Sequence, residues 1–231
     1  SQWMLKLSSN KSPRRFTTTG RLKRSLRYGE NPHQSASYYQ TDQNRDSLTN
    51  ASILQGKDLS FNNINDFNSA IEVLREFDNE PGALAVIIKH ANTCGVALRD
   101  DPLLAYLAAF DCDQTAAFGG VIAFNVNIDK KTAQAITQVF VEIVIAPSAD
   151  EDAIFEFSKK KDLRLIIIKK SQLLQKNELK FKQTSGGFLL QDQDTKRVTM
   201  DEIKVVSNKK PSNKNLSDML FAWKVAKYIK S

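Results

Sequence analysis

The feature that most constrains the fold is an unbroken apolar run at residues 83–88, which stops abruptly at Lys89 and His90 and leads into a turn containing Gly95. A short run without polar alternation is typical of a strand that is covered on both faces. Because the run stops at two ionisable side chains, we expect the strand to present them at its carboxyl end. In open α/β sheets ligands bind at that edge. The run therefore predicts an α/β fold with a candidate site at Lys89 and His90.

Similar apolar runs recur between segments of helical periodicity. Strands are expected at 83–88, 121–124, 142–146 and 163–168, with a hairpin of 188–191 and 197–200 after Gly186-Gly187. Helices are expected at 66–77 with Asp66 as N-cap, at 103–110 after Asp101-Pro102, and at 130–140, 149–159 and 216–230. Alternation of strands and helices predicts a largely parallel sheet with helices on both faces.

Size and composition set broad limits. The 231 residues, 41% hydrophobic and 26% charged, suffice for one large globular domain or two small ones. No apolar run is long enough to span a bilayer, and the first residues lack the apolar core of a secretory signal. Cys94 and Cys112 are too few for a disulfide framework, which favours a reducing compartment. We therefore expect a cytoplasmic protein that does not bind membranes.

The net charge of +7 is concentrated near the N-terminus. Residues 1–34 contain eight Lys or Arg and one acid, Glu30, whereas the rest of the chain has 25 basic and 25 acidic residues. A nucleic-acid-binding domain usually spreads basic residues over a face of its fold, so nucleic acid is not an expected partner. The basic stretch is interpreted as a solvated linker, or as a segment in which Arg27 holds a phosphate.

Two polar motifs precede the Lys-His pair. Residues 27–34, Arg-Tyr-Gly-Glu-Asn-Pro-His-Gln, begin with Arg27 and Tyr28, and an Arg fork beside Tyr suits a phosphate. Residues 54–66 hold Asn63 among three asparagines just before an expected helix. Asparagines there either satisfy free backbone amides or reach a ligand at the helix N-terminus. Each motif thus has a structural alternative, a polar capping loop or a helix cap.

Two further motifs have chemical potential. In the Lys89-His90 pair, an imidazole suits general acid–base work and a neighbouring ammonium can stabilise an oxyanion, although a plain surface turn also explains the pair. Residues 116–124 contain Phe118 and Gly119-Gly120. Glycines permit close backbone approach to a ligand and a phenyl ring can stack on it. A tight turn entering a strand is the alternative.

Several known signatures are missing from the sequence. There is no zinc-deaminase signature, no Walker loop, no Cys/His cluster with metal spacing and no Gly-x-Ser-x-Gly elbow. The sequence therefore predicts chemistry without a bound metal, without ATP hydrolysis and without a serine nucleophile.

The motifs taken in order resemble the formyltransferase part of the bifunctional aminoimidazole carboxamide ribonucleotide (AICAR) formyltransferase/IMP cyclohydrolase family. The resemblance runs from about Phe16 to the last residue. It implies a cytidine-deaminase-like three-layer sandwich with a mostly parallel central sheet and no zinc. It also implies transfer of a formyl group from the cosubstrate 10-formyltetrahydrofolate to the 5-amino group of AICAR, a step in purine (IMP) biosynthesis.

The resemblance implies roles for individual residues. Lys89 and His90 would be the catalytic pair, with His90 assisting removal of the amine proton and Lys89 stabilising developing charge. Arg27 and Tyr28 would hold the phosphate and ribose of the nucleotide.

Four more positions would contact the substrates. Asn63 and Glu142 would help to place the nucleotide, and Phe118 and Gly119 would lie between nucleotide and folate. The 5-amino group is a weak nucleophile because it is conjugated with the carboxamide, so positioning and proton removal should dominate catalysis.

The resemblance also implies a domain organisation. Residues 1–24 would be a linker or the tail of an upstream cyclohydrolase domain, and residues 25–231 the first half of the formyltransferase domain, truncated at its C-terminal end. Family members are homodimers, so a homodimer is expected. An alternative is an inactive nucleotide-binding fragment or paralogue. Thr93 stands where bacterial members usually have proline.

Overall fold

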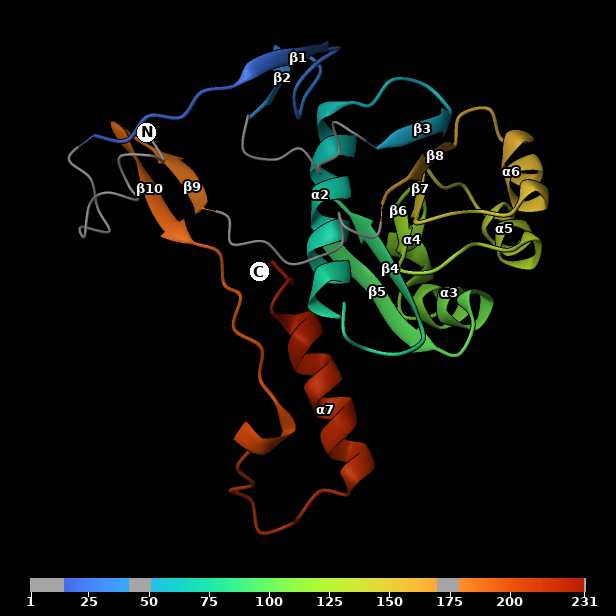
Figure 1. The fold of residues 1–231 in the computed structure, drawn as a ribbon, viewed down its shortest axis with the longest axis vertical. Coiled ribbons are helices and arrows are strands. Elements are labelled where there is room, and N and C mark those ends of the chain that lie inside the picture. The colour runs from blue at the N-terminus through green and yellow to red at the C-terminus, as the bar shows by residue number, and fades with distance from the viewer. Residues whose placement is uncertain (1–14, 42–50, 170–178, 231) are drawn as a thin grey trace.

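A computed structural model describes residues 15–41, 51–169 and 179–230. Its centre is a six-stranded sheet between two layers of helices (Figure 1). The strands, in spatial order, are β3 (Ser52–Gln55), β8 (Arg164–Ile167), β7 (Ile143–Ala146), β6 (Val121–Phe124), β4 (Ala83–Lys89) and β5 (Asn92–Arg99). The expectation of a three-layer α/β domain is confirmed.

The sheet is mixed, so the prediction of a mostly parallel sheet is wrong. Strands β6, β7 and β8 are parallel, whereas β3 is antiparallel to β8, and β4 is antiparallel to both β5 and β6. The unbroken apolar runs indicate that both faces of the strands are buried, but they do not indicate the direction in which neighbouring strands run. The turn between β4 and β5 is too short for the crossover that parallel pairing needs.

Helices cover both faces of the sheet. Helix α2 (Phe61–Glu76) lies on one face, and the apolar side chains of α7 (Asn213–Ala226) pack at the edge of the same core, with the rings of Phe77 and Phe221 5.1 Å apart. Figure 1 shows the remaining helices on the opposite face. These are α3 (Pro102–Phe110), α4 (Gln114–Ala117), α5 (Lys130–Ile136) and α6 (Glu151–Ser158). None of the helices within the described residues is long and apolar enough to cross a membrane.

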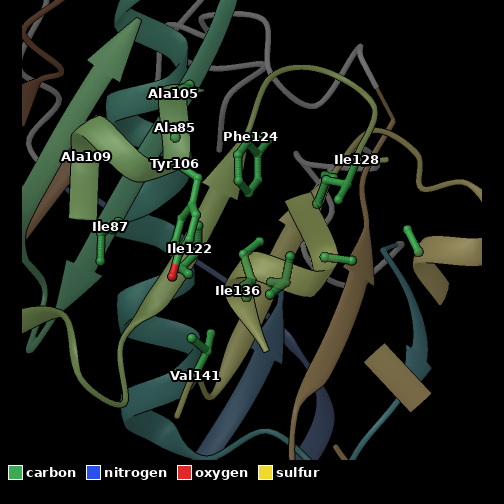
Figure 2. Close-up of a cluster of buried hydrophobic side chains, with 14 of the residues drawn as sticks. Ala85, Ile87, Ala105, Tyr106, Ala109, Ile122, Phe124, Ile128, Ile136 and Val141 are labelled. Atoms are coloured by element: carbon green, nitrogen blue, oxygen red, sulfur yellow. The ribbon is translucent and has the colours of Figure 1, made fainter. Parts of the chain in front are cut away.

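Strand β4 divides its side chains strictly between two cores. Ala83, Ala85 and Ile87 belong to the core shared with α3, α5 and α6, whereas the alternate residues Leu84, Val86 and Ile88 face α2. Figure 2 shows the first core, with the Tyr106 ring among the labelled apolar side chains. Burial in this core raises the pKa of Tyr106 to about 12.

Because β4 is packed against a core on each face, the strand that carries the Lys-His pair is held from both sides.

Two hairpins among the described residues lie outside the six-stranded sheet. The first pairs β1 (Arg21–Leu26) with β2 (Ala36–Gln40), so residues 21–24 of the segment predicted as a linker or tail belong to a strand. Residues 1–14 of that segment lie outside the described residues. The second pairs β9 (Leu179–Thr184) with β10 (Gly187–Asp192). The predicted partner strand at 197–200 is wrong, because Gly186, at φ +79°, closes the turn with the upstream strand.

Several predicted boundaries were right and others shifted. Asp101 caps α3 with Pro102 in its first turn, and strand 121–124 is as predicted. Asp66 is not an N-cap, because α2 begins five residues earlier with Ser60 as its cap. The helix predicted to reach residue 140 ends at Ile136. The last helix covers 213–226 instead of 216–230, β5 was not predicted, and residues 200–202 form a short 3-10 helix.

Candidate functional site

The candidate site lies at one edge of the sheet, where strands of opposite direction meet. Because β4 is antiparallel to β6, with Ile88 paired to Val121, the Lys-His pair at the end of β4 lies beside the glycines that precede β6. Glu142 precedes β7 at the same edge. The site is thus at the carboxyl end of β4 but at the amino ends of the parallel strands. The rule for parallel sheets predicted a site at the carboxyl ends of parallel strands, and the candidate residues instead lie at the amino ends of β6 and β7.

Lys89 contacts the glycine turn directly. Its Nζ donates a hydrogen bond to the backbone carbonyl of Phe118. Gly119 has φ +69°, and a Cβ built there would lie 3.2 Å from Lys89 Nζ and 3.2 Å from the ring of Phe140. The rings of Phe118 and Phe140 are 5.5 Å apart. Glycine at this position therefore lets the ammonium group and an aromatic pair share a small space.

His90 and Ala91 form the two-residue turn between β4 and β5. Both have left-handed backbone angles, φ 54° and φ 55°, which define a turn that normally requires Asn or Gly. Left-handed backbone costs a residue with a Cβ about 1–2 kcal/mol. The side chain of His90 is exposed, whereas Ala91 is buried. The histidine is therefore presented to solvent on a strained turn.

A carboxylate from α2 supports this turn. Asp66 Oδ1 accepts a hydrogen bond of 2.6 Å from the amide of Ala91, the second residue of the turn. Burial raises the pKa of Asp66, and the charge of Glu142 adds to the increase. The nearby backbone amides of Ala91 and His90, together with the charge of the His90 imidazole, oppose the increase in pKa. The bond to Ala91 places the Asp66 carboxylate beside the turn that carries His90.

Asn63 joins helix α2 to the entrance of β7. Its Nδ2 donates a hydrogen bond of 2.7 Å to Oε2 of Glu142. Its Oδ1 accepts the backbone amide of Ser60 at 3.1 Å, as part of the capping box that starts the helix. Asn63 is only 4% exposed. The same side chain therefore fixes the start of α2 and the orientation of a carboxylate.

A cavity of 610 Å³ adjoins these residues. Four predicted substrate-binding residues line it: Arg27, Tyr28, Asn63 and Glu142. Phe140, which contacts the Lys89–Gly119 pair, also lines it. The volume is in the usual range for a small-molecule site.

Most cations lining this cavity already have partners. Arg24 pairs with Asp58 at 2.8 Å, and Lys57 pairs with Asp162 at 2.6 Å, where the ammonium lowers the pKa of the aspartate. Arg164 donates to the carbonyl oxygens of residues 57 and 58.

Arg27 differs from those three cations. Among the ion pairs formed within the described parts of the chain, Arg27 has none, and its guanidinium lies 5.7 Å from the centre of the Tyr28 ring. It is therefore free to bind an anion.

The structure brings the predicted residues into two adjoining groups. Arg27, Tyr28, Asn63 and Glu142 line the cavity, whereas Lys89 contacts the segment of Phe118 and Gly119. Phe140 lies at the junction of the two groups. His90 does not line the cavity and is placed beside Asp66.

Sequence reasoning missed Asp66 and Phe140 as site residues. Asp66 was interpreted as a helix cap, although its spacing of three from Asn63 places both on one helix face. Phe140 was assigned to the end of a helix that stops at Ile136. No group of three or more His, Cys, Asp or Glu side chains within the described residues is placed to hold a metal ion.

Comparison with solved structures gives only a weak likeness. Acinetobacter baumannii RibD, form 1, matches with a TM-score of 0.38 and 14% identity, over 47% of this chain and 36% of that chain. A likeness at this level supports no argument about fold or function.

Comparison with known sequences is far more informative. The chain is 48% identical over all 231 residues to the bifunctional purine biosynthesis protein PurH of Paracoccus denitrificans (strain Pd 1222), and equally to that of Ruegeria sp. (strain TM1040). It spans 44% of the length of each relative. The family model described as AICARFT/IMPCHase bienzyme matches residues 1–231. The chain belongs to the AICARFT/IMPCHase bienzyme family.

Proposed function

We propose that this chain contributes the nucleotide-binding cavity and the catalytic pair of an AICAR formyltransferase. The reaction transfers a formyl group from 10-formyltetrahydrofolate to the 5-amino group of AICAR. Membership of the family supports this proposal, and the relatives are named bifunctional purine biosynthesis proteins. The proposal names a part of the catalytic unit, because the chain spans less than half of those relatives.

One observation carries the proposal. A 610 Å³ cavity with an unpaired guanidinium adjoins a lysine that is held against a glycine turn. A nucleoside monophosphate needs a cation for its phosphate and polar groups for its sugar and base. Arg27 supplies the cation, with the hydroxyl of Tyr28 as a further polar group beside it, and Asn63 with Glu142 supply polar groups for the sugar and base.

The chemistry follows from the pair at the end of β4. The 5-amino nitrogen attacks the formyl carbon and forms the new C–N bond, and the bond between that carbon and N10 of the folate then breaks. His90 accepts the proton that the amine loses, and the same proton can pass to the leaving N10. The ammonium of Lys89 stabilises negative charge on the formyl oxygen. Its hydrogen bond to the Phe118 carbonyl uses one of three donors, so two remain available.

The folate side of the proposal rests on Phe118 and Gly119. Phe118 is 57% exposed, so its ring is accessible for stacking beside the cavity. We place the pterin of the folate next to this ring, with the nucleotide on the side of Glu142.

Other expectations from the resemblance belong to the same proposal. The three-layer arrangement with a mixed central sheet supports a cytidine-deaminase-like fold. The proposed chemistry uses no zinc. A homodimer in the cytoplasm is the proposed assembly and location. Light scattering over a range of concentrations tests the assembly, and a strictly monomeric protein would contradict that part.

The catalytic assignment is tested by His90→Asn in the protein that carries this chain. Asparagine tolerates left-handed backbone, so the turn is kept while the imidazole is lost. Formyl transfer should fall by about 100-fold or more, the usual contribution of a general base, with an unchanged urea midpoint. Lys89→Met should also reduce formyl transfer, whereas Lys131→Met, which changes an exposed lysine of α5, should not. Near-normal turnover of His90→Asn would contradict the assignment of His90 as the general base.

The binding assignment is tested by calorimetry. Arg27→Ala should weaken AICAR binding about 10- to 100-fold, as expected for loss of a charged hydrogen bond, and leave binding of the riboside without phosphate unchanged. Equal loss for both ligands would contradict a phosphate role for Arg27. If the unmodified protein binds AICAR but shows no turnover with 10-formyltetrahydrofolate, the alternative of an inactive nucleotide-binding protein is correct.

A further inference from the structure

We propose that Asp66 is a positioning residue for formyl transfer, and that its carboxylate holds the left-handed turn which presents His90. The catalytic part of this inference, that Asp66 affects formyl transfer, rests on the proposed function. The contact between Asp66 and the turn stands independently of that function.

The turn needs external support. His90 and Ala91 are the only non-glycine residues with positive φ within the described parts of the chain. Asn or Gly usually occupies such positions in a two-residue hairpin turn, and neither is present here. The Asp66 carboxylate supplies a hydrogen-bond partner to this turn, with its Oδ1 2.6 Å from the amide nitrogen of Ala91.

The support comes from a rigid element. Asp66 lies in the second turn of α2, next to Phe67, which is 5% exposed, and one turn from Ala70, which is fully buried. The helix packs on β4, the strand that leads into the turn. The carboxylate is therefore fixed relative to the sheet and does not depend on a mobile loop.

One face of α2 reaches both parts of the site. Asn63 and Asp66 are three residues apart, so their side chains are neighbours on the helix surface. Asn63 orients Glu142 at the cavity, and Asp66 orients the turn that carries His90. A displacement of the turn relative to α2 therefore changes the distance between His90 and the nucleotide cavity.

A first experiment measures the turn without using activity. Hydrogen exchange of the Ala91 amide, followed by NMR, should accelerate by about 10-fold or more in Asp66→Ala, the change that follows when a local hydrogen bond is lost. Amides in the centre of β4 should be unchanged. Asp66→Asn keeps an acceptor oxygen and should show a smaller effect. The control Asp129→Ala removes a carboxylate–amide bond of 2.9 Å at the start of α5 and should leave Ala91 unaffected.

A second experiment separates positioning from binding. In Asp66→Ala, kcat for formyl transfer should fall by about 10- to 100-fold, as small misplacements of catalytic groups do, while KM for AICAR changes by less than about threefold. The second change Ala91→Gly makes the left-handed turn favourable without help. The double variant should therefore recover at least about fivefold in kcat, the size expected from relief of backbone strain. Asp129→Ala should keep normal kcat.

The outcomes distinguish the two levels of the proposal. Unchanged Ala91 exchange in Asp66→Ala overturns the turn-holding role. Accelerated exchange with unchanged kcat, or a kcat loss that Ala91→Gly does not rescue, overturns the positioning role. A rise in KM with unchanged kcat would assign Asp66 to substrate binding, and this result also overturns the positioning role. If His90→Asn keeps normal activity while exchange accelerates in Asp66→Ala, the proposed function fails and the structural contact stands.

Discussion

The Nδ2 atom of Asn63 lies 2.7 Å from Oε2 of Glu142 and donates a hydrogen bond that joins the first turn of α2 to the residue before β7. The two residues are 79 positions apart in the chain. Because Oδ1 of the same asparagine is used in the helix cap, the amide orientation is fixed and the carboxylate meets a donor. The pair can therefore be tested without removing the cap.

Asn63→Asp should destabilise the protein while keeping the capping oxygen. The new carboxylate lies against Glu142, and two like charges at hydrogen-bond distance in a half-buried site repel each other. We expect the free energy of unfolding to fall by about 1–3 kcal/mol, the range for a buried group that loses its partner. Urea unfolding at neutral pH measures this change.

The matched variant reverses the pair. Glu142→Gln alone keeps the size of the side chain, and Asn63→Asp with Glu142→Gln restores one donor and one acceptor in the opposite sense. The double variant should regain most of the stability lost by Asn63→Asp. Additive losses in the double variant would show that the two side chains do not interact.

Gly119→Ala should impair both stability and the Lys89 contact. The left-handed backbone and the 3.2 Å approach of a Cβ to Lys89 Nζ both oppose a side chain. We expect the free energy of unfolding to fall by about 1–2 kcal/mol, because alanine is strained in a left-handed backbone conformation. Turnover should also be reduced. Gly186→Ala is the control, because Gly186 also has positive φ but has open space around its Cβ position. It should lose stability with normal turnover, and equal turnover in both variants would contradict a role for the contact.

Thr93→Val should stabilise the protein. The Oγ1 of Thr93 is buried, with no hydrogen-bond partner among the described residues. Replacing an unsatisfied hydroxyl by a methyl of the same shape removes a desolvation cost and should add about 1 kcal/mol. The control Thr137→Val removes a hydroxyl that donates to the Gln134 carbonyl at 3.0 Å and should destabilise. Thermal unfolding compares the two. A lower unfolding temperature for Thr93→Val would show that the hydroxyl has a partner.

Tyr228 should make stability fall in alkaline solution. Burial, together with its hydrogen bond to Glu76 at 2.8 Å, raises the pKa of its hydroxyl above the ordinary value of 10.0. The folded protein then holds this proton more tightly than the unfolded chain. The contribution is complete below pH 10 and is lost as the pH rises above it.

Tyr228→Phe tests this dependence. At pH 8 it should be less stable than the unmodified protein by about 1–3 kcal/mol, because Glu76 loses a buried donor. The difference between the two proteins should narrow as the pH rises above 10, as urea unfolding at pH 8 and pH 11 can measure. Tyr39→Phe at an exposed site should leave the profile unchanged. A constant difference at both pH values would contradict the prediction.

The sequence predicted the buried elements well because their signals are local. The run at 83–88 is a strand, and Asp101-Pro102 starts a helix. Both were predictable because apolar burial and helix capping depend on residues that are adjacent in the sequence. Strand direction was mispredicted, because it depends on which distant strands become neighbours.

The site residues show the same division. Lys89 and His90 were predicted as site residues from their place after an apolar run, and their role stays a prediction. The contact between Asp66 and the turn was not predicted, because its partner Ala91 is 25 residues away and its side chain also suits a helix cap. The position of the site, at the amino ends of the parallel strands, follows from the reversed direction of β4 and has no local signal.

The strained turn between β4 and β5 also bears on the order of folding. A hairpin with a two-residue turn normally closes early, because its contacts are close in the chain. Here the favourable partner of the turn comes from α2, so we expect β4 and β5 to pair at this end only after the helix has docked. Ala91→Gly should then speed refolding, since it lets the hairpin close before the helix arrives. The segment that presents the histidine would thus be among the last parts of the sheet to form.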